Sequence, residues 1–296
     1  CTRSRPSCTR PCRDEKRSSM QISYDWIERI DSTNSELKRR SSQSVLPEGY
    51  VVSANQQTAG RGRSGHSWQS PAGTSISTSM LLHPDTLPME AVPRLTLLAA
   101  MATVLAIEEE TGIESRIKWP NDIVIAGRKA AGILTEMAAE EGRARYVLVG
   151  IGINVHQRSY DPQIADKAIS LDEAVLLRGG ADFGHRESVH ADNRETGDRA
   201  GISHISRRKL IRSIWEHFSD LYREFLQTAD LEFLLSDYNE RLVNREQRVR
   251  VMDPAGAYEG ICRGVNSRGE LIVESEGRRR MINSGEVHVR GLYGYV

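Results

Sequence analysis

Residues 56–68 (QQTAGRGRSGHSW) combine two arginines with three closely spaced glycines and a tryptophan, and few folds need that mixture. Glycine permits left-handed and close-approach backbone geometries. Guanidinium groups bind phosphate oxygens bidentately, and an indole offers a flat face to a purine. The stretch therefore predicts a loop that binds nucleotide phosphates, although glycine, serine and arginine also make up exposed loops without a function.

The same glycines match the dinucleotide-binding pattern Gly-x-Gly-x-x-Gly at positions 60, 62 and 65. That pattern requires a strand that leads directly into the glycines and a helix that follows them. Here the apolar run Tyr50–Ala54 ends six residues before the first glycine, and residues 67–73 (SWQSPAG) are unable to begin a helix. These flanks exclude a Rossmann fold.

The 296 residues suffice for one large and one small domain, and basic and acidic residues balance at 40 each. This balance gives no global attraction to nucleic acids or membranes. The longest apolar stretch, Leu95–Ile107, is shorter than a bilayer span and predicts a buried helix. Cys1, Cys8 and Cys12 follow no signal-peptide core and lack zinc-ligand spacing, so we expect a cytoplasmic protein without thiol-bound metal.

The chain divides by composition into three parts. Residues 1–19 are rich in arginine, serine and cysteine, which predicts a disordered basic leader, with a nucleic-acid-binding arm as the alternative. Residues 20–242 form the larger predicted domain, in which the polar segment 178–206 is expected to be a flexible insertion. Short strand patterns separated by turns at 253–256 and 266–269 predict a small SH3-like β-barrel over residues 243–296.

The larger domain mixes helical and strand periodicities in an order typical of an α+β fold. Helices are expected from Asp31 to about Arg40, at Pro93–Thr111 before Gly112, at Leu171–Leu177, and along an aromatic stripe at 210–225. Strands are expected at 22–30, 50–54, 75–82, 115–119, 123–126, 130–138 and 145–151. We therefore expect a mainly antiparallel sheet with helices on one face.

A second group of chemically active residues lies in the predicted hairpin that turns at residues 127–128. Asp122 opens its first strand and Lys129 its second, so the turn brings a carboxylate and an amine together across the ladder. A structural ion pair is the alternative. Gly132 favours a binding site because it leaves space beside Lys129. Farther on, residues 150–154 (GIGIN) end a strand with glycines and Asn154, an amide that can read a purine edge.

Arginines, a lysine, a carboxylate, an indole and an amide together predict an ATP site. The Walker pattern Gly-x-x-x-x-Gly-Lys-Ser/Thr occurs nowhere in the chain. A site rich in fixed cations suits attack on a phosphate, where catalysis is mostly positioning and charge stabilisation.

These residues resemble the signature of bacterial biotin–protein ligases over roughly residues 30–296. The resemblance rests on five motifs in order, namely residues 32–34 (STN), 57–63 (QTAGRGR), 119–122 (WPND), 129–134 (KAAGIL) and 150–154 (GIGIN). It implies a catalytic domain similar to class II aminoacyl-tRNA synthetases, followed by an SH3-like barrel. It also implies that biotin and Mg·ATP give biotinyl-5′-AMP, and that biotin then passes to one lysine of a biotin carboxyl carrier protein of acetyl-CoA carboxylase or another biotin-dependent carboxylase.

The resemblance also implies roles for individual residues. Biotin would contact Ser32, Thr33, Gln57, Gly60, Arg61, Arg63, Lys129, Gly132 and Gly150. ATP would contact Arg61, Arg63, Trp68, Lys129 and Asn154, with Trp68 and Asn154 receiving the adenine. Lys129, Arg63 and Asp122 would be catalytic, and Asp122 would assist Mg²⁺ or the acceptor lysine.

Two departures and two alternatives accompany the resemblance. Ser64 and His66 stand where some members carry further arginines, which implies a less basic loop. Residues 1–29 contain no pair of amphipathic helices of the helix-turn-helix type, so no operator binding is expected of this chain. The alternatives are a lipoate–protein ligase, whose Gly-Gly-Gly-x-x-x-His-Asp-type signature is missing, and a biotin-responsive repressor with its DNA-binding segment upstream. A homodimer is left open.

Overall fold

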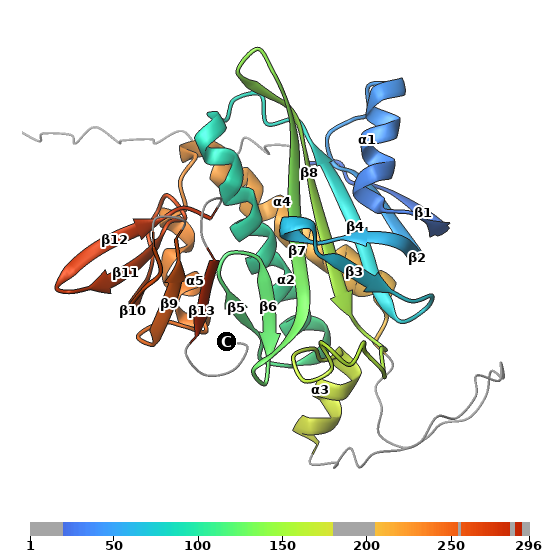
Figure 1. Ribbon diagram of the computed structural model, residues 1–296. Helices are drawn as coiled ribbons and strands as arrows, with labels where there is room; N and C mark the ends of the chain where they lie inside the picture. The colour runs from blue at the N-terminus through green and yellow to red at the C-terminus, as the bar shows by residue number, and fades with distance from the viewer. Residues whose placement is uncertain (1–19, 180–204, 254–255, 285–287, 292–296) are drawn as a thin grey trace, which may run out of the picture.

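An eight-stranded mixed sheet forms the centre of the computed structural model, which describes residues 20–179, 205–253, 256–284 and 288–291. The strand order is β1-β2-β4-β8-β7-β6-β5, with β3 paired to β2 (Figure 1). The strands are β1 (Ser23–Ile30), β2 (Tyr50–Arg61), β3 (Ser67–Ser70), β4 (Ser75–Leu82), β5 (Arg116–Lys118), β6 (Asp122–Ile125), β7 (Arg128–Glu140) and β8 (Arg143–Asn154). Every pair is antiparallel except β1 with β2, as expected for a mainly antiparallel α+β sheet.

Two long helices cover one face of this sheet, α2 (Leu95–Thr111) and α4 (Arg207–Thr228) (Figure 1). A 3₁₀ turn at Met89–Arg94 leads into α2, which ends at Gly112 with a left-handed φ of 66°. The apolar span Met89–Thr111 is long enough to cross a membrane, but 72% of its apolar 18-residue window is buried inside the structure. The aromatic stripe of α4 is core, as predicted.

Helix α1 (Thr33–Gln43) lies on the opposite face, which the expectation of helices on one face does not include. Side chains alternate between the two faces along a strand. Val52 of β2, Leu81 of β4 and Leu148 of β8 accordingly form a separate cluster with Leu37 of α1. Their neighbours in sequence belong to the main core under α2 and α4.

Strand β2 is longer than its apolar run indicates, and the predicted end at Ala54 is wrong. It continues through Gly60 to Arg61, turns over a 3₁₀ segment at Arg63–Gly65 and returns as β3. Gly60 pairs with Trp68 across this hairpin. The glycines therefore belong to a β-hairpin with no helix behind it, which agrees with the exclusion of a Rossmann fold.

The C-terminal strands form a second antiparallel sheet of SH3-like size, in the order β12-β11-β10-β9-β13. They are β9 (Arg248–Met252), β10 (Tyr258–Val265), β11 (Leu271–Ser275), β12 (Arg278–Ile282) and β13 (His288–Gly291). The 3₁₀ turn Glu232–Leu234 and helix α5 (Leu235–Arg241) lead into it, and α3 (Leu171–Arg178) precedes α4. The predicted leader 1–19 and residues 180–204 of the predicted insertion lie outside the described residues.

Candidate active site

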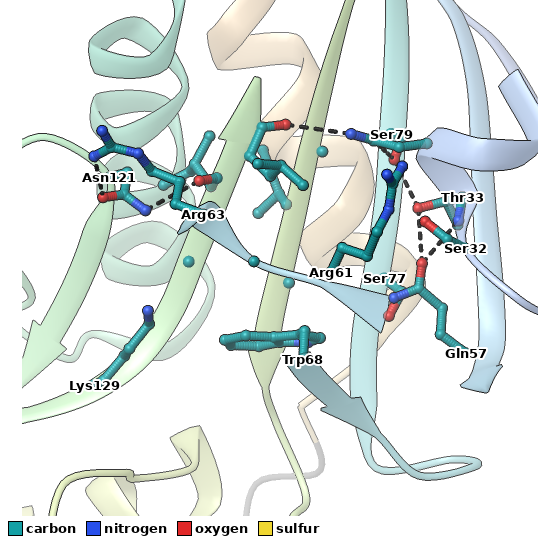
Figure 2. Close-up of a pocket in the computed structure, with 18 residues that line it drawn as sticks. Ser32, Thr33, Gln57, Arg61, Arg63, Trp68, Ser77, Ser79, Asn121 and Lys129 are labelled. Atoms are coloured by element: carbon teal, nitrogen blue, oxygen red, sulfur yellow. Dashed lines mark hydrogen bonds between the residues drawn. The ribbon is translucent and has the colours of Figure 1, made fainter. Parts of the chain in front are cut away.

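A small pocket opens between the start of α1, the β2–β3 hairpin and the glycine-rich parts of β7 and β8 (Figure 2). Its volume is about 50 Å³. The sequence-predicted residues that line it are Ser32, Thr33, Gln57, Arg61, Arg63, Trp68, Lys129, Gly132 and Gly150. Elements from three parts of the chain thus bring most of the predicted site residues together.

The base of the pocket is a chain of hydrogen bonds between uncharged side chains (Figure 2). The Gln57 side-chain oxygen accepts from the main-chain N–H of Thr33 at 2.8 Å and from its hydroxyl at 3.1 Å. The Thr33 hydroxyl also lies 2.6 Å from the Ser79 hydroxyl, which donates to the Asn34 side-chain oxygen at 2.6 Å. Ser79, Ser77 and Asn34 were not assigned a ligand role from the sequence, although serines at alternate positions of β4 mark one face of that strand.

Ser32 is fixed at the entry of α1 by the carboxylate before it. Asp31 accepts from the Ser32 main-chain N–H at 2.8 Å and forms a salt bridge with Arg39 at 2.7 Å. The hydrogen bond from Arg39 lowers the pKa of Asp31 to about 2. The carboxylate therefore stays charged in neutral solution and keeps the first turn of α1 in place.

The two arginines of the hairpin point to different partners. Arg61 donates to Glu136 at 3.1 Å and to the Ser35 hydroxyl at 3.3 Å. Arg63 donates to the Asn121 side-chain oxygen at 3.1 Å and to the main-chain oxygen of Ser284, between β12 and β13. Burial lowers the pKa of Arg63, while the charge of Asp122 opposes that shift. Arg61 thus lies over the uncharged base of the pocket and Arg63 over the WPND segment.

The hairpin brings Lys129 and Asp122 together as predicted, and the two side chains form the ion pair that was the alternative interpretation. The Lys129 Nζ to Asp122 Oδ1 distance is 2.6 Å, and both side chains are largely shielded from solvent. The turn between them is made by Ala126 and Gly127, both with positive φ. A Cβ at Gly132 would lie 3.2 Å from the Lys129 Cε and 3.3 Å from its Nζ, so the lysine side chain packs directly against this glycine.

The indole of Trp68 lies against two glycines that face each other across β7 and β8. Gly132 and Gly152 are paired in register, and a Cβ at Gly152 would lie 2.5 Å from the indole. The Lys129 Nζ is 5.8 Å from the centre of the ring, a cation–π distance. The bare backbone therefore forms the surface on which the predicted stacking residue rests.

Gly60 and Gly150 occupy positions where a side chain has no room. A Cβ at Gly60 would approach the Trp68 main-chain oxygen to 2.4 Å, and one at Gly150 would approach the Asn34 side-chain oxygen to 2.4 Å. Asn154, at the end of β8, is 6% exposed and donates to the main-chain oxygens of Lys129 and Ile169 at 3.5 and 3.3 Å. It lies away from the small pocket but lines the cleft beside it.

That adjoining cleft has a volume of about 520 Å³, within the usual range for a small-molecule site. Trp68, Arg63 and Lys129 line both cavities, so the two lie side by side. Among the described residues, no group of three or more His, Cys, Asp or Glu side chains could hold a metal ion. Asp122 supplies a single carboxylate, which fits a Mg²⁺ ion held mainly by substrate phosphates and water.

Comparisons with known proteins agree with this combination of fold and pocket. Residues 26–154 match the biotin/lipoate A/B protein ligase family, and residues 246–290 match the biotin protein ligase C-terminal domain. The bifunctional ligase/repressor BirA of Bacillus spizizenii is 36% identical over 90% of this chain and 73% of its own length. The chain therefore belongs to the biotin/lipoate A/B protein ligase family.

Two further similar proteins are named as biotin ligases. A biotin–[acetyl-CoA-carboxylase] ligase of Mycobacterium tuberculosis is 29% identical over 90% of this chain and 89% of its own length. The solved structure of a biotin protein ligase from Aquifex aeolicus in complex with biotin and ATP has a TM-score of 0.71 and is 25% identical, covering 90% of this chain and 98% of that one.

Proposed function

We propose that this chain is an ATP-dependent biotin–protein ligase. The observation that carries the proposal is a pair of adjoining cavities, which together form a site with two chemically different ends. Uncharged donors and acceptors, Thr33 and Gln57 among them, form one end, and the Lys129–Asp122 pair with Arg63 forms the other. A ureido ring needs uncharged hydrogen-bonding groups of both kinds, whereas a carboxylate and a triphosphate need cations.

The first step joins biotin to AMP. A biotin carboxylate oxygen attacks the α-phosphorus of ATP, an O–P bond forms, and pyrophosphate leaves with the electron pair of the broken bond. Ser32, Thr33 and Gln57 hold the ureido group, with Gly60, Gly132 and Gly150 providing close backbone approach. Lys129 and Arg61 bind the carboxylate, so that two negatively charged reactants can approach each other.

The second step transfers the acyl group to an amine. The neutral lysine amine of a biotin carboxyl carrier protein attacks the acyl carbon, an amide bond forms, and AMP leaves. Lys129 and Arg63 neutralise the departing phosphate, while Asp122 accepts the proton that the attacking amine loses. Trp68 stacks on the adenine, and Asn154 supports that position by holding the Lys129 main chain.

Mg²⁺ would be held by the phosphates of ATP with Asp122 as its protein partner, and it would supply charge neutralisation. Its fit depends on exchange of the Lys129–Asp122 contact, since the 2.6 Å pair engages the same carboxylate. The small pocket has only about 50 Å³, so we infer that it widens when biotin binds.

The remaining parts of the proposal concern the domains, the location, the partners and the choice between biotin and lipoate. The two sheets support a division into a catalytic domain at 20–242 and a barrel at 243–296. We propose a cytoplasmic enzyme that acts on a carboxylase carrier domain without binding nucleic acid, and a homodimer is compatible with this activity. Lipoate lacks a ureido group and would give the polar base of the pocket no hydrogen-bonding partner on the ligand, which favours biotin.

Biotin-dependent exchange of labelled pyrophosphate into ATP tests the first step. Lys129→Ala is expected to lower the exchange rate at least about 100-fold, because a group that neutralises transition-state charge is lost. Lys38→Ala, at an exposed position of α1, is the matched control and should exchange normally. Circular dichroism checks that both variants are folded. Exchange that responds to lipoate and not to biotin would overturn the proposal.

A further inference from the structure

Glu136, on β7 beyond Gly132, holds two site residues with one carboxylate oxygen. Its Oε2 accepts from the Asn34 side-chain nitrogen at 2.7 Å and from the Arg61 Nη2 at 3.1 Å. Asn34 comes from the first turn of α1 and Arg61 from the end of β2. One side chain thereby joins three elements at the rim of the small pocket.

The Asn34 branch of this contact leads directly into the uncharged base of the pocket. The Asn34 side-chain oxygen accepts from Ser79, which lies against Thr33, and Thr33 donates to Gln57. The Asn34 amide has no freedom to shift toward β8, because it packs directly on Gly150. Glu136 therefore helps to fix which end of the amide points into the network, since a carboxylate accepts only from the nitrogen end. The Leu134 main-chain oxygen, 3.4 Å from the same nitrogen, is a second and longer acceptor.

In the second branch, Glu136 determines where the positively charged Arg61 guanidinium lies. The Arg61 side chain is 48% exposed, and its other described partner is the Ser35 hydroxyl at 3.3 Å. An exposed pair of this kind contributes little to folding stability. Its effect is on geometry, because Glu136 engages Nη2 and leaves Nη1 and Nε without hydrogen bonds to the described residues. Those two groups remain available to a second carboxylate.

We propose that Glu136 is a positioning residue for biotin, acting through Asn34 at the ureido end and through Arg61 at the carboxylate end. The inference rests on the proposed function, because it takes biotin as the ligand of the small pocket. Glu136 keeps its contact with Nη2 when biotin binds, and the remaining donors of Arg61 take the biotin carboxylate. Without Glu136, both side chains must be ordered by the substrate, which weakens biotin binding.

Biotin binding by calorimetry, with and without Arg61, tests this role. Glu136→Ala is expected to raise the biotin Kd about tenfold, equivalent to about 1.4 kcal/mol, with the exchange kcat at saturating biotin within about twofold of the wild type. In an Arg61→Ala background the same substitution should raise the Kd only about threefold, because one branch is already lost. Equal effects in the two backgrounds would contradict the coupling.

Two further variants separate positioning from a loss of structure. Glu136→Gln keeps an acceptor for Asn34 but removes the charge from Arg61, so an intermediate rise of about threefold is expected. Glu140→Gln lies on the same strand and changes an exposed carboxylate whose partner is Arg145, so its Kd should equal that of the wild type. Wild-type protein that binds no biotin would refute the proposed function itself. Wild-type protein that binds biotin no better than Glu136→Ala would refute only the role of Glu136.

Discussion

The position of Trp68 depends on two neighbouring residues that have no side chain. The indole rests on Gly132 and Gly152, which face each other on β7 and β8. A side chain at Gly152 would occupy the place of the ring, and a Cβ at Gly132 would already touch it at 3.4 Å. The position of the stacking residue is therefore set by two strands that are far from it in sequence.

Gly152→Ala tests this dependence. The new Cβ would lie 2.5 Å from the indole, so Trp68 must move away from β8 while the strand keeps its register. We expect the rate of biotin-dependent exchange to fall about 10- to 100-fold, because small misplacements of binding groups are costly. Steady-state exchange should show a higher KM for ATP. Gly179→Ala, whose Cβ would meet no atom closer than 3.6 Å, is the matched control, and an equal loss there would contradict this explanation.

Among helices and strands, the apolar periodicity of the sequence predicted the elements that have a regular buried face. The aromatic stripe of α4 and the strand at 75–82 were expected from their patterns, and these elements lie where expected. Strand β2 was cut short at Ala54 because its polar half has little strand propensity. Pairing with β1 and β3 overrides that preference.

The sequence could identify some residues of the site and not others. Thr33, Gln57 and Lys129 were found because they belong to recognisable motifs, and the structure places them in one cavity. Glu136 and Ser79 were missed because a single polar residue in a strand is ordinary by itself. Their significance comes from the order β4-β8-β7, which a single sequence does not contain.

Phe218→Ala tests the role of α4 as a core element. Phe218 is fully buried, with its ring edge-on to Trp215 at 5.7 Å and stacked on Tyr222 at 5.8 Å. Its truncation should lower the free energy of unfolding by about 3–5 kcal/mol, measured by urea titration. The exchange rate per folded molecule should change little, since α4 lies across the sheet from the pocket. Leu177→Ala, 43% exposed on α3, should change stability by no more than about 0.5 kcal/mol.

At the scale of the whole molecule, the two sheets share one apolar core. Val249, Val251 and Leu271 of the second sheet belong to the same buried cluster as α2 and α4. The Trp119 indole N–H donates to the Gly269 main-chain oxygen at 3.1 Å, and both groups are buried there. A continuous core of this kind resists independent movement of its parts. The second sheet, which the β2–β3 hairpin contacts, is therefore held in a fixed position.

Arg63 makes that contact, because its guanidinium reaches from the hairpin to Asn121 and to the main chain of Ser284. If Arg63 closes the cleft over the adenylate, Arg63→Ala should speed release of labelled biotinyl-5′-AMP about 10- to 100-fold, since charge-assisted hydrogen bonds are lost. The biotin Kd should change less than about threefold, because the ureido contacts lie at the other end of the cavity. Arg116→Ala, in an exposed ion pair on β5, is the matched control. Release from Arg63→Ala at the wild-type rate would show that the barrel contact has no part in retaining the intermediate.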